Sequence, residues 1–210
     1  MTSPAERAMA AVGGYDSAVA RTTTLLSFQS EFSHLTSDNQ ILARNLIERA
    51  FLHLQRSIVA DPTVQSSWQR AFDAGETACE RLGSTHLLLH GIWAFKANSA
   101  GERTDLVLGT RLEITPQIEG ASEALVLTEW KVVRKASEYH QRADEALRQA
   151  RLYSAGSLAG FELSDRRYIV IVSQDRLGEA PSDHVENGVE YQFKNIVVAP
   201  ESPSIAVTRS

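Results

Sequence analysis

The sequence predicts an α/β protein in which helices pack against a central sheet. Apolar residues recur at a helical period in the first third of the chain, which indicates amphipathic helices. Three segments rich in Leu and Val follow between residues 85 and 133, and such segments are typical of buried strands. A helical pattern and another apolar strand come next. The expected order of the central elements is therefore helix, three strands, helix and strand.

The first sixty residues are expected to be mostly helical. Residues 1–15 are weakly patterned and are expected to form a mobile terminus. Residues 16–35 are a weaker helix candidate, because three consecutive threonines stand at its centre. The apolar positions of Ile41–Ile58 follow the period of an α-helix, so this segment is predicted to be helical.

A turn then separates the helical start from a larger domain. Asp61 and Pro62 are expected to end the preceding helix and to begin another over Val64–Leu82, which ends near a glycine. We therefore expect a helical extension over residues 1–62 and a domain over residues 63–210.

The elements of the central sheet follow in order. The predicted strands and the helix between them are Thr85–Lys96, Arg103–Gly109, Ala124–Val133, helix Ala136–Ala155 and strand Arg167–Ser173. The dipeptide Asn187-Gly188 is a strong turn signal. The apolar segments Val189–Val198 and Ile205–Thr208 are predicted to add edge strands at the C-terminus.

Composition narrows the class of protein. The formal net charge is −5, with 21 Lys and Arg against 26 Asp and Glu, which counts against a stand-alone DNA-binding protein. No apolar run approaches the ~20 residues of a membrane span, and the N-terminus lacks the layout of a secretion signal. Cys79 is the only cysteine, so no intrachain disulfide and no cysteine-based zinc site are expected. We expect a cytoplasmic protein with no membrane partner.

Charged residues interrupt two of the apolar strands. Asp105 lies in the second predicted strand, and Glu129 and Lys131 lie in the third. Residues two apart on a strand point to the same face, so Glu129 and Lys131 project together, and a paired neighbouring strand would bring Asp105 beside them. A carboxylate is costly to bury unless it is paired or binds a cation. The three residues therefore indicate either a metal site or a structural ion pair at a sheet edge.

The pattern Thr104-Asp105, followed after 23 residues by Glu129-Trp130-Lys131, resembles the PD-(D/E)xK nuclease superfamily. The resemblance implies a restriction-endonuclease-like αβββαβ core with a mixed central sheet. It also implies that Asp105, Glu129 and the backbone carbonyl of Trp130 bind Mg²⁺ or Mn²⁺. Lys131 would then orient or deprotonate the attacking water and stabilise charge in the transition state. Thr104 stands where the family has proline, a position that carries no chemistry.

The helix after this motif resembles the RecB-like branch of the family. Gln149 and Tyr153 match its Q-x-x-x-Y element, which lies near the site and helps to position DNA. The segment from Lys131 to Arg151 holds six basic and three acidic residues, so Arg134 and Arg142 are further candidates for substrate binding. A solvated Gln, a core Tyr and a mixed helix surface remain the alternative interpretation.

Some members of the family add a Glu from the helix before the first strand. Glu76 and Glu80 are the candidates for this additional acid, and Glu113 on the second strand is another. His86 and His90 are four residues apart, a spacing that on a helix suits zinc. On the predicted strand they would lie ~13 Å apart, too far to share one metal.

The leading expectation is a Mg²⁺-dependent nuclease that hydrolyses phosphodiester bonds of DNA, in a restriction, anti-phage defence or repair system. The alternatives are a non-catalytic nuclease-fold subunit that binds nucleic acid or a partner protein, and an RNase on the same fold. The N-terminal helices are expected to dock a partner protein or to form a homo-oligomer. The sequence leaves open DNA against RNA, endo- against exonuclease action, sequence specificity and the activator.

Overall fold

The fold is described from a computed structural model, which describes residues 4–97, 103–107, 121–152, 162–178 and 182–200. The chain divides into two compact units, Met1–Asn39 and Gln40–Ser210. Helix α1 spans Pro4–Ala60, so it forms the first unit and contributes its C-terminal part to the second. The second unit contains every other element.

The second unit is a mixed α/β structure. Its elements after α1 are α2 (Pro62–Ala74), α3 (Glu76–Leu89), β1 (Ile92–Ala97), β2 (Arg103–Asp105), β3 (Ala124–Val133), a 3₁₀ turn η1 (Ala136–Glu138), α5 (Tyr139–Arg151), β4 (Arg166–Ser173), β5 (His184–Glu186) and β6 (Val189–Val197). The strands form one six-stranded sheet in the order β2-β1-β3-β4-β6-β5. β1, β3, β4 and β6 run parallel, while β2 and β5 pair antiparallel with their neighbours at the two edges.

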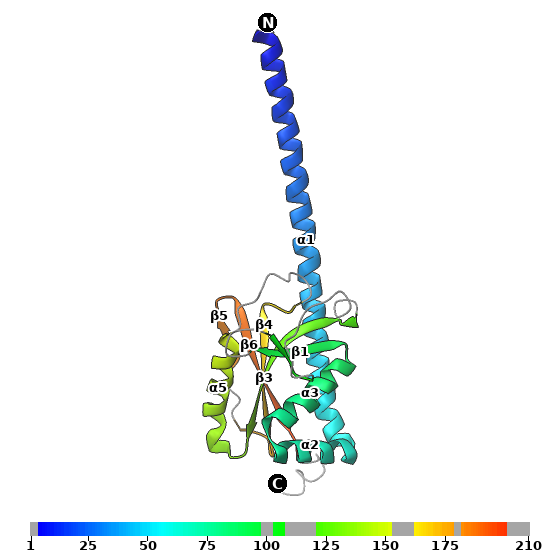
Figure 1. Cartoon of the computed structure of the whole chain (residues 1–210), viewed down its shortest axis with the longest axis vertical. Helices are drawn as coiled ribbons and strands as arrows, with labels where there is room; N and C mark the ends of the chain where they lie inside the picture. Colours follow the sequence, from blue (N-terminus) through cyan, green and yellow to red (C-terminus); the bar gives the residue numbers. More distant parts are fainter. Residues whose placement is uncertain (1–3, 98–102, 108–120, 153–161, 179–181, 201–210) are drawn as a thin grey trace. The chain divides into compact units, whose positions relative to one another are not determined.

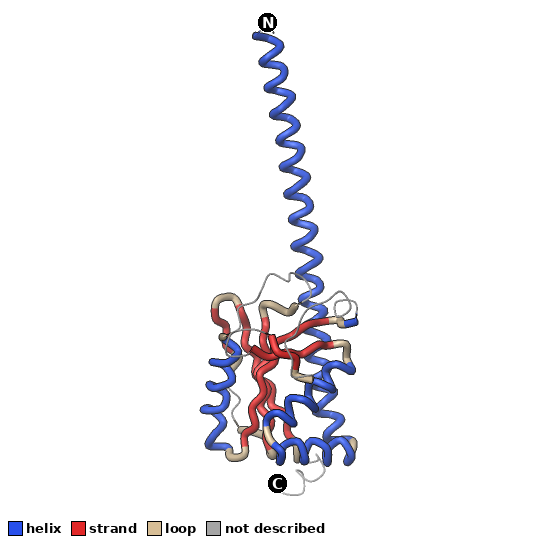
Figure 2. The backbone as a smooth tube through the Cα atoms, viewed as in Figure 1, coloured by secondary structure: helices blue, strands red, loops and turns tan. Residues whose placement is uncertain are grey.

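Helices cover both faces of the sheet. Figure 1 shows α5 on one side and α2 and α3 on the other, and Figure 2 shows the strands between these layers. The strand side chains alternate between two cores, as the pleat requires. On β4, Tyr168, Val170 and Val172 pack with α1, α2 and α3, whereas Ile169 and Ile171 pack with α5. Burial on both faces explains why β3 and β4 read as continuous apolar runs.

The core of the second unit includes the C-terminal part of α1. Its buried residues there are Ala43, Ile47, Ala50, Phe51, Leu54 and Ile58. These residues follow the helical period that predicted a helix over Ile41–Ile58. The apolar face of this helix packs inside the domain. The compact unit therefore begins at Gln40, whereas the sequence suggested a boundary after residue 62. The boundaries differ because the C-terminal part of α1, which the sequence suggested was part of an extension, packs into the core of the second unit.

Several predicted elements are confirmed. The strand over Ala124–Val133 has the predicted bounds, and β4 extends the predicted Arg167–Ser173 by one residue. Asn187 and Gly188 both have positive φ, 52° and 78°, and connect β5 to β6 as a tight hairpin. The predicted strand over Ile205–Thr208 lies outside the described residues.

Three boundaries in the helical part were predicted wrongly. α1 begins at Pro4, so the predicted mobile terminus over residues 1–15 is wrong, whereas the weaker helix candidate over residues 16–35 is confirmed. No proline lies between Pro4 and Pro62, and the helix propensity cost of Thr is below about 0.7 kcal/mol per residue, too small to end a helix. The helix expected over Val64–Leu82 is two helices, because Gly75 takes a φ of 112° between α2 and α3.

The third error concerns the segment predicted as the first strand. α3 continues to Leu89, and β1 begins only at Ile92. The run of three leucines before His90 fits a buried strand and a buried helix equally well, which is a known ambiguity of short apolar runs. His86 and His90 consequently lie one helical turn apart, at the C-terminal end of α3, and not on a strand.

The C-terminal strands also differ from the prediction. β6, predicted as an edge strand, lies inside the sheet between β4 and the short β5. β5 pairs with β6 over Val189–Tyr191. Beyond that stretch, side chains bind the backbone of β6. Asp183 accepts the N–H of Phe193 at 3.1 Å, and the Gln55 amide both donates to the Val197 carbonyl (3.0 Å) and accepts its N–H (2.8 Å).

Within the described part of the chain, no helix combines the length and the apolar character needed to cross a bilayer.

We predict that Gly83→Ala destabilises the protein, although Gly to Ala in a helix normally stabilises by about 0.5–1 kcal/mol. A Cβ at Gly83 would lie 2.1 Å from the Trp130 ring, so the substitution overpacks the core. Overpacking costs about 1–3 kcal/mol, which exceeds the gain in helix propensity. Urea unfolding of the variant measures the change. The loss in the free energy of unfolding should be smaller in a Trp130→Phe background, where the ring is smaller. A Gly83→Ala protein that is more stable than wild type would contradict the close approach of Trp130 to Gly83.

Candidate active site

Glu129 and Lys131 project from the same face of β3. Side chains two residues apart on a strand point to the same face, so Glu129 and Lys131 lie on the same face as Leu125 and Leu127. The side chains of these two leucines pack in the core beneath α5. The register of β1 with β3 covers Ala124–Leu127. Both charged residues therefore lie on the part of β3 beyond that pairing, where side chains from α3 can reach them.

Helix α3 brings two further acids to this place. Glu76 lies in the first turn of α3, and Glu80 lies one turn later. The Lys131 Nζ atom is 2.8 Å from Glu76 Oε1 and 3.2 Å from Glu129 Oε1, so it bridges α3 and β3. Glu80 accepts two hydrogen bonds from Lys96 Nζ, at 2.7 and 3.0 Å, near the end of β1. The structure thus joins acids and amines from three elements.

The three glutamates form a possible cation site. Glu76, Glu80 and Glu129 each offer a carboxylate oxygen, and these oxygens lie within 4.8 Å of one another. Glu80 and Glu129 are buried, while the Glu76 side chain is 38% exposed and leaves the group open to solvent. Hard divalent cations prefer oxygen ligands, and Mg²⁺ keeps several of its waters, so this donor set fits Mg²⁺ or Mn²⁺.

Burial and charge act in opposite directions on the β3 pair. Burial raises the pKa of Glu129 to about 7, although the ammonium group of Lys131 opposes the shift. Burial lowers the pKa of Lys131, but the hydrogen bond to Glu76 and the charge of Glu129 outweigh it, and the pKa stays above its usual value. Lys131 is therefore protonated at neutral pH, and Glu129 is poised between its two forms.

The site opens into a cleft of ≈470 Å³ between α3, β3 and α5. Its lining residues are Glu76, Lys131, Arg142, Glu145, Arg148, Gln149 and Leu152. Arg142 Nη1 lies 2.9 Å from Glu145 Oε2 on the exposed face of α5. The structure thus brings two predicted substrate-binding residues, Arg142 and Gln149, into the same cleft as Lys131.

Asp105 lies elsewhere in the sheet. β2 pairs with β1, and β1 separates β2 from β3, whereas the sequence suggested that the Asp105 strand would lie directly beside β3. The Asp105 carboxylate is buried and accepts hydrogen bonds from the indole N–H of Trp93 and from the backbone N–H of Val107. Among the described residues, the acidic group around Glu129 does not include it.

Two other predicted residues contribute to packing. Arg134 donates to the carbonyls of Phe72 and Asp73 at 3.0 and 3.1 Å and lies over the Phe72 ring, so it holds the C-terminal end of α2. The Trp130 side chain is buried against Trp68 on the face opposite Lys131, with ring centroids 6.3 Å apart. The predicted residues Tyr153 and Glu113 lie outside the described residues.

Two residues of the site have no counterpart in the sequence analysis. Lys96 pairs with Glu80, and Arg148 lines the cleft beside Gln149. A lysine at the end of an apolar strand was the available signal for Lys96, but the pairing follows only from the position of α3. Arg148 precedes Gln149 on α5, and nothing in its spacing distinguishes it from the other arginines of that helix.

Comparisons with models of protein families, with curated proteins and with solved structures found no match for this chain.

We predict that Glu129→Gln makes the stability of the metal-free protein less dependent on pH. Because the pKa of Glu129 is raised to about 7 by burial, the wild-type protein loses stability as pH rises from the unfolded-state value near 4.5 through 7. The glutamine variant lacks this loss, so it should gain up to about 3 kcal/mol relative to wild type between about pH 5 and pH 8. Urea unfolding in EDTA at the two pH values gives the difference.

The exposed carboxylate of Glu123 provides the control for this experiment. Glu123→Gln should change the free energy of unfolding by a similar small amount at both pH values. An equal pH dependence in Glu129→Gln and wild type would show that the Glu129 carboxylate is ionised normally.

Proposed function

We propose that this protein is a metal-dependent nuclease that hydrolyses phosphodiester bonds of DNA. One observation carries the proposal: Glu76 and Glu80 of α3 lie beside the Glu129-x-Lys131 motif of β3, at the end of a cleft lined by basic residues of α5. The resemblance of the motif to PD-(D/E)xK nucleases, including the members that add a helix Glu, supports the same function.

The residues that would hold Mg²⁺ or Mn²⁺ are Glu129, Glu80 and Glu76. Their chemistry suits a hard cation, because each supplies a carboxylate oxygen. A bound ion supplies positive charge at the substrate phosphate and lowers the pKa of a coordinated water. Glu76 and Glu80 of α3 thus replace Asp105 as metal ligands, because Asp105 lies on β2, which β1 separates from β3.

Lys131 has an electrostatic role in the proposed reaction. The hydrogen bond that Lys131 donates to Glu76 and the charge of Glu129 keep the pKa of Lys131 above its usual value, so Lys131 holds its proton at neutral pH. A protonated amine cannot deprotonate the attacking water. It can stabilise the negative charge that develops on the phosphorus oxygens, an effect that is large in a partly dehydrated site.

The α5 wall of the cleft suits a phosphate backbone. One helix, α5, contributes three polar residues that line the cleft together with Lys131 of β3: Arg142, Arg148 and Gln149. Basic side chains supply most of the affinity for duplex DNA through phosphate contacts, and an amide can add a hydrogen bond. The lining of the cleft holds three basic residues against two acids, Glu76 and Glu145. On a chain with a net charge of −5, this local excess of positive charge favours substrate binding at this position over general binding to the surface.

One observation favours a second candidate, a non-catalytic subunit that binds nucleic acid or a protein. Lys131 and Lys96 already pair with all three glutamates, so the group is an ion-pair network that needs no metal for its stability. An RNase on the same fold would use the same residues. The substrate and the requirement for metal separate these functions.

The N-terminal part of α1 supports a proposed protein partner or self-association. Leu25, Leu26 and Phe28 are 69%, 59% and 66% exposed. Large apolar side chains grouped on a helix surface mark sites of protein contact more often than single ones do.

We predict that Lys131→Ala lowers the rate of Mg²⁺-dependent DNA cleavage by at least about 100-fold, because it removes charge stabilisation from the transition state. The assay uses supercoiled plasmid, linear duplex, single-stranded DNA and RNA, with Mg²⁺, Mn²⁺ or EDTA. Glu80→Gln should abolish the metal-dependent cleavage in the same assay, because it removes a proposed metal ligand. Circular dichroism confirms that each variant is folded.

Lys135→Ala is the matched control, since it removes the same charge from an exposed side chain just after β3. Its cleavage rate should remain within a small factor of wild type. Loss of cleavage in Asp105→Asn but not in Glu80→Gln would return the first metal ligand to Asp105. Binding of DNA without cleavage by wild type under every condition would favour the non-catalytic subunit.

A further inference from the structure

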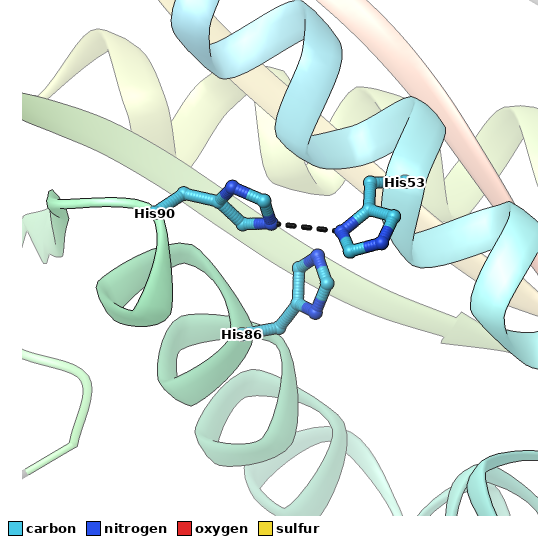
Figure 3. Close-up of side chains that lie close together, drawn as sticks. All are labelled: His53, His86 and His90. Carbon is cyan, nitrogen blue, oxygen red and sulfur yellow. Dashed lines mark hydrogen bonds between the residues drawn. The ribbon is translucent and has the colours of Figure 1, made fainter.

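Three histidines from two helices converge at the C-terminal end of α3. His53 projects from α1, His86 lies in the last turn of α3, and His90 caps that helix. Figure 3 shows a nitrogen atom of each ring turned toward the other two rings. One ring nitrogen from each residue lies within 4.8 Å of the others, and His53 Nδ1 is 3.0 Å from His90 Nε2.

The fold requires this convergence. His86 and His90 lie one helical turn apart, so they occupy one side of α3. The buried Leu87 beside them belongs to the same core as Ala50 and Leu54 of α1, which flank His53. Packing of α1 on α3 thus fixes the distance between the two helices. The ring centroids are 4.9 to 5.6 Å apart in all three pairs.

The spacing of the ring nitrogens suits one transition-metal ion. Zinc bound by imidazole has Zn–N bonds of about 2.0–2.1 Å, and a tetrahedral ion therefore holds its ligand nitrogens about 3.3 Å apart. The observed 3.0 Å between His53 and His90 is close to that edge length. His86 also contacts the Ala50 carbonyl through Nε2 at 3.1 Å, the kind of backbone contact that orients a metal-binding imidazole.

The surroundings favour the neutral form of His86 and of His90. Burial lowers the pKa of His86, and so do the adjacent imidazoles, although the Ala50 carbonyl opposes them. Burial, His53 and the nearby Arg49 lower the pKa of His90. Neutral imidazole is the form that binds metals. The positive charge of Arg49 and the lack of an acid in this histidine group make it a poor site for Mg²⁺.

We propose that His53, His86 and His90 bind one divalent transition-metal ion, of which zinc is the representative, with a fourth position open to solvent through the exposed His53. This site is separate from the acidic group of the proposed nuclease in both ligand type and position. The acidic group lies in the N-terminal half of α3, and the histidines lie at its C-terminal end. A bound ion would join α1 to α3 and so stabilise the helix that also presents Glu76 and Glu80.

We predict that the full chain, after its metal is removed with EDTA, binds one zinc ion per molecule. His53→Ala and His90→Ala should each bind zinc at least about tenfold more weakly, because each variant loses a ligand. Competition with a chromophoric zinc chelator measures the affinity. Zinc should also raise the thermal unfolding midpoint of wild type but not of the variants.

His140→Ala is the control, because His140 is exposed on α5 outside the histidine group. It should bind zinc as wild type does. Cobalt added to wild type gives a second readout that needs no variant, since a four-coordinate histidine site produces visible absorption. Equal zinc affinity in wild type and both histidine variants, or zinc binding lost only in Glu80→Gln, would overturn the proposal.

The two proposals fail separately. Mg²⁺-dependent cleavage measured in His53→Ala reports on the acidic group, whereas zinc affinity measured in Lys131→Ala reports on the histidines. Cleavage without zinc binding removes only the histidine site, and zinc binding without cleavage removes only the nuclease.

Discussion

The close approach of α3 to β3 is the constraint on which both candidate sites depend. Gly83 has no side chain, so the ring of Trp130 occupies the space where a Cβ would lie. This contact fixes α3 at a short distance from the sheet. Its first two turns then bring acids to Glu129 and Lys131, and its last turn brings His86 and His90 to α1. A single helix therefore positions two groups of different chemistry.

The charges near β3 are tolerated because they are shared among elements. A buried carboxylate is costly alone, and burial is the main cause of the high pKa of Glu129. Lys131 offsets part of that cost through contacts on two sides, and Lys96 does the same for Glu80. Such a network is stable without an ion, yet its half-exposed Glu76 leaves a route for a cation to enter. The same arrangement can therefore be stable as an ion-pair network and still bind a divalent cation.

The sequence predicted the regular elements of the sheet better than the connections between layers. Strand β3 and its Glu129-x-Lys131 motif follow from local apolar patterning, and so do β4 and the hairpin at Asn187. The strand order does not follow from local patterning, because the insertion of β1 between β2 and β3 depends on long-range pairing. The histidine group was missed for a local reason, since three leucines before His90 fit a strand as well as a helix.

The outer side of β6 has a consequence for the behaviour of the protein in concentrated solution. A long parallel strand with free backbone groups is a template on which a second molecule can add its own strand. Here β5 covers the beginning of β6, Asp183 accepts the N–H of Phe193, and the Gln55 amide binds both backbone groups of Val197. The Gln55 side chain thus imitates the backbone of one more strand residue. Through this amide, helix α1 adds to the protection that β5 and Asp183 give the outer side of β6 against the addition of a strand from a second molecule.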